Sequence, residues 1–350
     1  MGKIVRTILL ILLLAAAAGA AYVAYEANRF LATAPETPGQ EVLIDIRHGA
    51  TLNRIAVLLQ EKGVITDEFR FRLLARFKKV DARLQAGRFA FHTGWLPERV
   101  LEELLHGRPV FTRVTIPEGY TWWQTGRALE AAGMVTAADF EAVIHDPAFL
   151  RHYGIPFASA EGFLMPDTYL LKTPDETKPL DAKQARSVAG RMVDNFWRKA
   201  GAIWPDGRKP GRDDLKKAVI LASIVEKETA VESERARVAG VYANRLRKGM
   251  LLQADPTVIY GIGPDFNGNL TRKDLADEKN AYNTYKHPGL TPGPICSFGA
   301  SALKAAVYPE EHKYLYFVAI TDGGAHEFST TLTQHNAAVR RYLQNRRKQR

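Results

Sequence analysis

Glu226 is the residue whose place in the sequence most clearly favours acid–base chemistry. It falls near the end of the stretch 213–229, in which apolar residues recur at the spacing of a largely buried helix. Asp213 and Asp214 supply an N-cap and favourable charge where this predicted helix begins. Burial disfavours the ionised form of a carboxyl group, and the negative end of a helix dipole does the same. Both effects raise the pKa of Glu226, so that it could protonate a leaving oxygen near neutral pH.

Two other interpretations of this stretch remain open. Glu226 could belong to a solvated Glu-Lys-Glu run that ends the helix without any chemical role. Glu228 lies two positions further along, roughly opposite on a helix, so we do not expect the two carboxyl groups on one face. Glu228 is therefore the next residue to test if Glu226 is not the acid.

The residues around Glu226 resemble the signature region of a known family. Residues 221–261, which read LASIVEKETAVESERARVAGVYANRLRKGMLLQADPTVIYG, are similar to that region in the endolytic murein transglycosylases, the MltG or YceG-like family. Further matching segments are 161–169 (EGFLMPDTY), 281–285 (AYNTY), 289–295 (GLTPGPI) and 314–318 (YLYFV). The resemblance covers nearly the whole chain and implies that Glu226 is the catalytic residue.

The resemblance also implies a reaction. Such an enzyme cleaves the MurNAc-β-1,4-GlcNAc bond within peptidoglycan glycan strands, without water, and leaves a 1,6-anhydroMurNAc end. One acid can serve twice, because Glu226 would protonate the departing oxygen and then take the proton of the C6 hydroxyl. A hydrolase would need a second carboxylate, or an equivalent group, to activate water. The family role is linked to terminating strands as they are made, so the resemblance suggests peptidoglycan synthases (penicillin-binding proteins) as partners.

Three alternatives to a transglycosylase were compared with the sequence: a non-catalytic binder, a cysteine enzyme and a metal-dependent enzyme. A non-catalytic peptidoglycan-binding scaffold of the wall-synthesis machinery is the main alternative, although a pure binder need not retain Glu226 inside an intact family motif. Cys296 could suggest a cysteine nucleophile, but its neighbours lack the pattern of wall-remodelling transpeptidases. The histidines show no paired metal-ligand spacing. We therefore expect no metal site and no cofactor.

A group of polar and aromatic residues in predicted loops is suited to binding sugars. Aromatic faces can stack on a sugar ring, and polar side chains can bind its hydroxyl and acetamido groups. Asp255 precedes Pro256 and is therefore expected in a turn rather than in a helix. Ordinary loop chemistry without a ligand is the alternative for each residue. The predicted substrate-binding residues are Glu161, Gln253, Asp255, Thr257, Tyr260, Asn283 and Tyr285.

The net charge of +10 could suggest a nucleic-acid-binding protein, but its distribution argues against one. Six of the positive charges lie in the acid-free tail 340–350, and Lys3 and Arg6 supply two more. The rest of the chain, which is 46% hydrophobic and 25% charged overall, has the composition of ordinary globular domains. We expect no nucleic-acid partner.

The N-terminus predicts a membrane anchor. Residues 7–25 are uncharged and mostly Ile, Leu and Ala, which is enough to cross a bilayer as a helix. The cations before them place the N-terminus in the cytoplasm and the remainder outside the cytoplasmic (inner) membrane. A cleavable signal peptide is the alternative, with a small-residue site at 32–34. We favour a retained anchor, so that 1–34 forms the cytoplasmic tip, the span and the linker.

The rest of the chain reads as an α+β protein with an internal repeat. Residues 44–52 align with 114–122, and each copy predicts a strand, a Gly turn, a Thr-capped helix ended by Gly, and a second capped helix. The first copy, in 41–110, resembles a LysM-like βααβ module, which in many proteins holds N-acetylglucosamine chains; a spacer is the alternative. Residues 111–155 form a second, connecting segment, and 156–350 form the catalytic domain with its basic tail.

Overall fold

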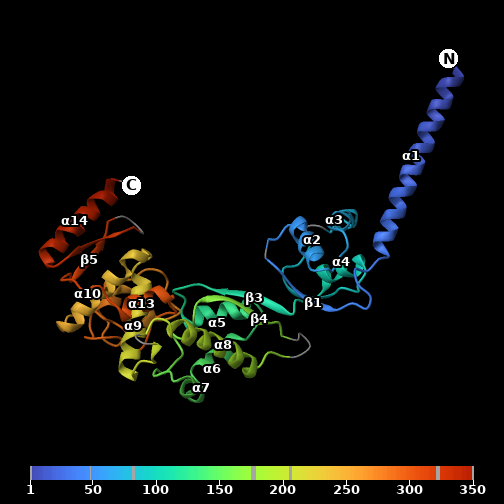
Figure 1. The fold of residues 1–350 in the computed structure, drawn as a ribbon. Helices are drawn as coiled ribbons and strands as arrows, with labels where there is room; N and C mark the ends of the chain where they lie inside the picture. The colour runs from blue at the N-terminus through green and yellow to red at the C-terminus, as the bar shows by residue number, and fades with distance from the viewer. Residues whose placement is uncertain are drawn as a thin grey trace. The chain divides into compact units, whose positions relative to one another are not determined.

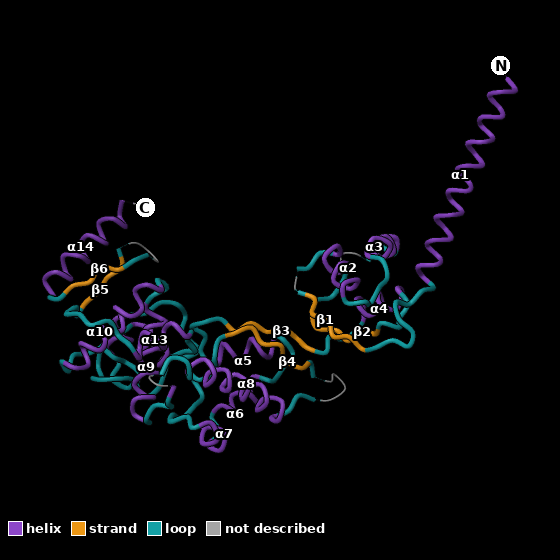
Figure 2. The backbone as a smooth tube through the Cα atoms, in the orientation of Figure 1, coloured by secondary structure: helices purple, strands orange, loops and turns teal. Residues whose placement is uncertain are grey.

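The computed structural model describes residues 2–47, 49–80, 83–174, 179–204, 207–320 and 324–348 (Figures 1 and 2). The chain divides into two compact units. The first consists of 1–113 with 170–173, and the second of 114–169 with 174–350. Both contain helices and strands without a regular βαβ alternation, in agreement with the predicted α+β class.

A long apolar helix, α1 (Gly2–Leu31), opens the first unit (Figure 1). Its segment Ile8–Leu31 is long and apolar enough to cross a membrane, and the large side chains from Ile8 to Leu14 are exposed. Near the end of the helix, by contrast, Phe30 is buried in the core of the first unit. These properties are consistent with the predicted single anchor.

The body of the first unit has the predicted order of strand, helix, helix, strand. β1 (Glu41–Ile46) pairs antiparallel with β2 (Gly87–His92), so that Leu43 lies opposite Ala90. Between them in the chain come α2 (Leu52–Glu61) and α3 (Glu68–Phe77), and α4 (Pro97–His106) follows β2. Ile44, Phe71 and Phe89 are among the residues that fill the core. This order alone does not identify a LysM module, so that likeness stays a prediction.

The second copy of the repeat forms the same elements as the first. It consists of β3 (Phe111–Ile116), α5 (Trp122–Ala131) and α6 (Ala137–Ile144). Thr51 and Thr121 cap the first helix of each copy, and each hydroxyl accepts the backbone N–H three residues later. Gly63 and Gly133 follow those helices with φ of 70° and 69°, a left-handed conformation that favours glycine. β4 (Asp167–Lys172) completes a four-stranded sheet in the order β1-β2-β3-β4.

The second unit is built around one buried helix, α9 (Arg212–Glu228). Every residue from Ala218 to Val225 is buried, because α9 is apolar on nearly all sides. The predicted N-cap is wrong: Gly211 occupies that position, and Asp213 and Asp214 lie in the first turn. Around α9 lie α10 and α13 (Figure 1), and α11 also contacts it. Besides α5, α6 and α9, the unit contains α7 (Pro147–Tyr153), α8 (Ala182–Ala200), α10 (Arg235–Arg247), α11 (Asp255–Ile262), α12 (Arg272–Ala276) and α13 (Ala300–Val307).

The C-terminal part is a hairpin with a helix packed on it. β5 (Tyr316–Ala319) pairs antiparallel with β6 (His326–Ser329), and α14 (Leu332–Lys348) contacts both. β5 lies within 314–320, a segment that includes the family-like run 314–318. Ser329 pairs with Tyr316 in the hairpin, so α14 begins after it.

Candidate active site

Glu226 lies on the last turn of α9, with a side chain only 6% exposed. Its Oε1 accepts a hydrogen bond from Arg235 Nη2 at 3.1 Å, and its Oε2 accepts one from the Gly299 N–H at 3.0 Å. Arg235 begins α10, and Gly299 is the N-cap of α13. Three helices that pack together therefore fix this one carboxyl group.

Burial raises the pKa of Glu226 above its ordinary value. The Gly299 N–H and the Arg235 guanidinium oppose this shift, and the negative charge of Glu118 reinforces it. The predicted direction is confirmed, with desolvation as the largest cause. A carboxyl group in this state can hold a proton at higher pH than a solvated one and then donate it.

Arg235 connects Glu226 to residues that the sequence did not single out. Its guanidinium is buried, bonds the Ser301 hydroxyl, and lies 3.6 Å from Glu118 Oε2. Glu118 belongs to the turn between β3 and α5, and the sequence pattern placed it only within the repeat. A pairing between residues more than a hundred positions apart leaves no local pattern from which to infer it.

Backbone hydrogen bonds join that turn to the segment before α13. The Gly119 N–H donates to the Ser297 carbonyl at 2.8 Å, and the Ser297 N–H donates to the Tyr120 carbonyl at 2.7 Å. Ser223 of α9 accepts from the Ile295 N–H at 3.0 Å. Main-chain hydrogen bonds thus hold the turn of Glu118 against the segment before α13, and the buried Ser223 hydroxyl attaches that segment to α9.

Cys296 lies in the same segment but is unsuited to nucleophilic attack. It is fully buried, and its Sγ donates to the Ser223 carbonyl at 3.3 Å. Burial raises the pKa of this thiol well above its usual range, which disfavours the reactive thiolate. Within the described residues, no group of three His, Cys, Asp or Glu side chains could hold a metal ion.

Glu228 belongs to a neighbouring but separate set of contacts. Burial raises its pKa to about 7, with a contribution from the charge of Asp255, while a hydrogen bond with Tyr242 and the Arg245 charge act in the opposite direction. Its partners are thus different from those of Glu226, as expected for two carboxyl groups on different sides of a helix.

Two of the predicted sugar-binding residues, Asp255 and Tyr285, lie near Glu228. Tyr285 Oη donates to Asp255 Oδ1 at 2.6 Å, and burial, that hydrogen bond and the charge of Glu228 raise the pKa of Tyr285. Gln253 is exposed, and its backbone N–H donates to the Thr284 carbonyl. The prediction that Asp255 lies outside a helix is wrong: it is the first residue of α11, where the following proline is tolerated.

Two others are buried parts of the framework. Asn283 is fully buried, and its amide donates to the carbonyls of Asp274, Leu275 and Asp277. Thr257 is also fully buried, and its hydroxyl donates to the Ala254 carbonyl at 2.7 Å. Because their polar groups are used within the protein, we assign both residues a supporting role rather than direct contact with a ligand.

Glu161 is likewise enclosed, and it pairs with Tyr260. Its Oε2 accepts the Trp122 N–H at 2.9 Å, and its side chain is fully buried. Burial raises the pKa of Glu161 to about 8, although this N–H, that of Gly162 and a hydrogen bond with Tyr260 oppose the shift. Glu161 therefore supports the first turn of α5 and is not available to a ligand.

The ring of Tyr260 belongs to an aromatic cluster that the sequence patterns did not predict. Its centroid lies 5.0 Å from that of Trp123 and 4.9 Å from that of Tyr282. All three side chains are partly exposed. In the sequence, the adjacent Trp122 and Trp123 were the signal for such a cluster, but two neighbouring tryptophans are equally typical of a hydrophobic core.

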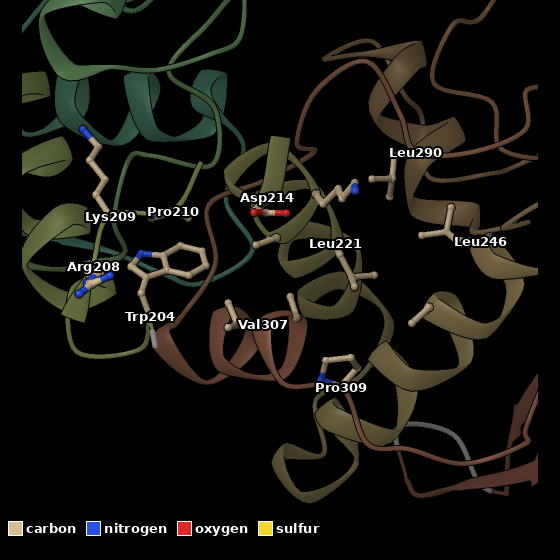
Figure 3. Close-up of a pocket in the computed structure, with 14 residues that line it drawn as sticks. Trp204, Arg208, Lys209, Pro210, Asp214, Leu221, Leu246, Leu290, Val307 and Pro309 are labelled. Carbon is tan, nitrogen blue, oxygen red and sulfur yellow. The ribbon is translucent and has the colours of Figure 1, made fainter. Parts of the chain in front are cut away.

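A cavity of about 820 Å³ opens on another side of α9 (Figure 3). Leu221 of α9, Leu246 of α10 and Val307 of α13 line it, with Trp204 and Lys209 at one end. Glu226 is not among its lining residues. The cavity is therefore distinct from the cluster around the candidate acid.

Comparison with known proteins agrees with the resemblance seen in the sequence. The model of the YceG-like family matches residues 44–341. The endolytic murein transglycosylase of Bacillus subtilis (strain 168) is 29% identical over 320 residues, which cover 87% of this chain and 86% of that protein. The endolytic murein transglycosylase of Streptococcus pneumoniae (strain R6) is 26% identical over 334 residues, covering 87% of this chain and 59% of that protein. A crystal structure of a YceG-like protein from Listeria monocytogenes matches with a TM-score of 0.58 and 30% identity, over 85% of this chain and 98% of that one. The chain therefore belongs to the YceG-like family.

Proposed function

We propose that this protein is a peptidoglycan lytic transglycosylase that cleaves MurNAc-β-1,4-GlcNAc bonds within glycan strands and leaves 1,6-anhydroMurNAc ends. The observation that carries the proposal is the single carboxyl group of Glu226, nearly buried, raised in pKa and held by Arg235 and Gly299. The names of its relatives give the substrate class, and the site supplies a residue able to perform the chemistry.

The reaction needs one group that first donates and then accepts a proton. Protonated Glu226 transfers its proton to the glycosidic oxygen as the bond from that oxygen to C1 of MurNAc breaks. The resulting carboxylate takes the proton of the C6 hydroxyl as O6 bonds to C1, which closes the anhydro ring and restores the acid. Arg235 and the Gly299 N–H stabilise the carboxylate between the two steps.

Gln253, the residues near Glu228 and the aromatic cluster are the proposed contacts to the glycan. Gln253, Asp255 and Tyr285 present polar groups, and Trp123, Tyr260 and Tyr282 present partly exposed rings. Sugars are bound by this combination of hydrogen bonding and stacking on apolar ring faces. The strand–helix–helix–strand body of the first unit resembles LysM modules in its order of elements. A sugar-binding role for this body would let it hold the same polymer.

A product analysis in ¹⁸O-labelled water tests the activity directly. The detergent-solubilised full chain is incubated with purified glycan strands, and the ends are identified by mass spectrometry. Transglycosylation gives anhydro ends that contain no solvent oxygen, whereas hydrolysis gives reducing ends that carry ¹⁸O. Reducing ends would contradict the lytic chemistry, and binding without cleavage would favour the scaffold.

The protein is also proposed to remain anchored in the inner membrane through α1, with the chain that follows α1 outside the cytoplasm. The length and apolar character of Ile8–Leu31 support a span, and Lys3 and Arg6 support a cytoplasmic N-terminus. We infer that it terminates new strands beside the synthases that make them. Mass spectrometry of the mature protein should find α1 intact, and a mature N-terminus at Pro35 would contradict the anchor.

A further inference from the structure

Glu118 occupies a turn that is fixed at both ends. Gly119, next to it, has φ of 78°, and Thr121 caps α5 with a reciprocal capping box. The backbone pairing of Gly119 and Tyr120 with Ser297 holds the turn against the segment before α13. The Glu118 side chain is 49% exposed and that of Glu226 is 6% exposed, so solvent reaches the carboxyl group of Glu118 far more than that of Glu226.

Glu118 and Glu226 share one nitrogen of Arg235. Arg235 Nη2 lies 3.1 Å from Glu226 Oε1 and 3.6 Å from Glu118 Oε2. The guanidinium therefore divides its charge between a nearly buried carboxyl group and a half-exposed one. Were Glu118 absent, the whole interaction would favour the ionised form of Glu226.

Gly299 makes room for this arrangement. A Cβ added to Gly299 would lie 1.9 Å from Glu118 Oε1 and 2.5 Å from Glu118 Cδ. The φ of Gly299 is −75°, which any residue can adopt, so a side chain at this position would displace the carboxyl group of Glu118 rather than strain the backbone. The same residue donates its N–H to Glu226, so one position accommodates both carboxyl groups.

The charged and titratable groups that face Glu226 come from every element packed against it. They are Arg235 of α10, Glu118 of the turn before α5, Lys227 of α9 itself and the buried thiol of Cys296. Arg235 and Lys227 favour the carboxylate, and Glu118 favours the acid. The Lys227 ammonium group also donates to the Gly119 carbonyl at 3.3 Å.

We propose that Glu118 is a positioning residue, which holds Arg235 between two carboxyl groups and thereby keeps Glu226 in its acid form for proton donation. The inference rests on the proposed function of Glu226. Glu118 itself does not take part in proton transfer to the sugar. Glu118 instead affects the fraction of enzyme molecules in which Glu226 is protonated at a given pH. It also affects the position of Arg235 after Glu226 has lost its proton.

The test compares Glu118→Gln with Glu141→Gln, an exposed glutamate on α6, in the full-length enzyme between pH 5 and pH 9. Removing the Glu118 charge makes ionisation of Glu226 easier, so the alkaline limb of kcat should move to lower pH by about one unit. Cleavage on the alkaline limb of the profile should then fall by up to about 10-fold, the deficit should disappear on the acid side of that limb, and KM should stay unchanged. Glu141→Gln should follow the wild-type profile throughout.

Two outcomes would overturn the inference. An unshifted Glu118→Gln profile would mean that Glu118 does not influence the acid. An equal loss at every pH would mean that Glu118 acts directly or only supports the fold. Glu118→Asp, which keeps the charge, should have an alkaline limb close to that of wild type. If Glu226→Gln still cleaves, the proposed function itself fails, and that result is independent of the Glu118 comparison.

Discussion

Two carboxyl groups of the second unit, Glu226 and Glu161, are desolvated in different ways. Glu161 accepts backbone N–H groups, pairs with Tyr260 and is fully buried. Glu226 is nearly buried, but its partners include a guanidinium that also contacts the half-exposed Glu118. Burial raises the pKa of both groups, so a raised pKa alone does not identify a catalytic residue. The two sites differ in their access to solvent and substrate. Glu161 is enclosed, whereas the partners of Glu226 extend to the half-exposed Glu118.

The largest effect is expected for Glu226→Gln. The amide keeps the shape of the side chain but cannot donate the proton, so glycan cleavage should fall by at least about 100-fold. The amide oxygen of the substituted side chain can still accept the Gly299 N–H, and Arg235 retains Glu118, so stability at neutral pH should stay within about 1 kcal/mol of wild type. A strongly destabilised Glu226→Gln would instead identify a structural ion pair with Arg235.

Glu161→Ala should lower stability, whereas Glu226→Gln should lower activity. It leaves the Trp122 N–H and the Tyr260 hydroxyl without an acceptor and opens a cavity, so at pH 5 it should cost about 3 kcal/mol in urea unfolding. Glu130→Ala is the matched control, since that exposed carboxyl group also accepts a backbone N–H, from Ala137 at 2.8 Å. It should cost about 1 kcal/mol or less. Equal losses of unfolding free energy in the two variants would show that the burial of Glu161 contributes no additional stability.

The deficit of Glu161→Ala should shrink as the pH rises. The folded protein holds the proton of Glu161 up to about pH 8, whereas the unfolded chain releases it near the ordinary pKa of 4.5. Wild-type stability contributed by this group is therefore complete below about pH 4.5 and is lost between there and pH 8. Between pH 5 and pH 7 the deficit should decrease by about 2 kcal/mol. A constant deficit would mean that Glu161 ionises normally in the folded state.

A smaller pair of effects separates the predicted loop residues. Asn283→Ala removes the donor to three carbonyls and should cost about 2 kcal/mol of stability. Gln253→Asn shortens an exposed side chain and introduces a residue that tolerates the φ of 51° at this position, so stability should change by less than about 0.5 kcal/mol. If Gln253 contacts sugar, kcat/KM should fall by up to about 10-fold. No kinetic change in Gln253→Asn would exclude it from the subsites.

Local patterns in the sequence predicted the parts of the fold that depend on local physics. The spacing of apolar residues identified α9, and the Thr and Gly positions of the repeat identified the caps and ends of α2 and α5. β6 was missed because its four residues, His326–Ser329, are stabilised by pairing with β5 and do not form an alternating run of their own.

The site residues also differ in whether local sequence patterns could predict their roles. Burial of Glu226 follows from the apolar helix that carries it, so its pKa direction could be predicted from the sequence alone. Asn283 and Thr257 were predicted to be ligand contacts because a polar side chain in a loop looks alike whether it binds sugar or main chain. Glu118 and Gly299 could not be found, since only the tertiary fold brings the turn after β3 to the N-terminus of α13.

The burial of Cys296 has a consequence for how the chain behaves among other proteins. This is the only cysteine in the sequence, so an accessible thiol here would be open to oxidation or to a disulfide with a neighbouring chain. Its Sγ is instead covered and directed at a carbonyl of α9. Thiol reagents should react with the native protein only when this region opens, and the labelling rate then measures how often α9 separates from the segment that precedes α13.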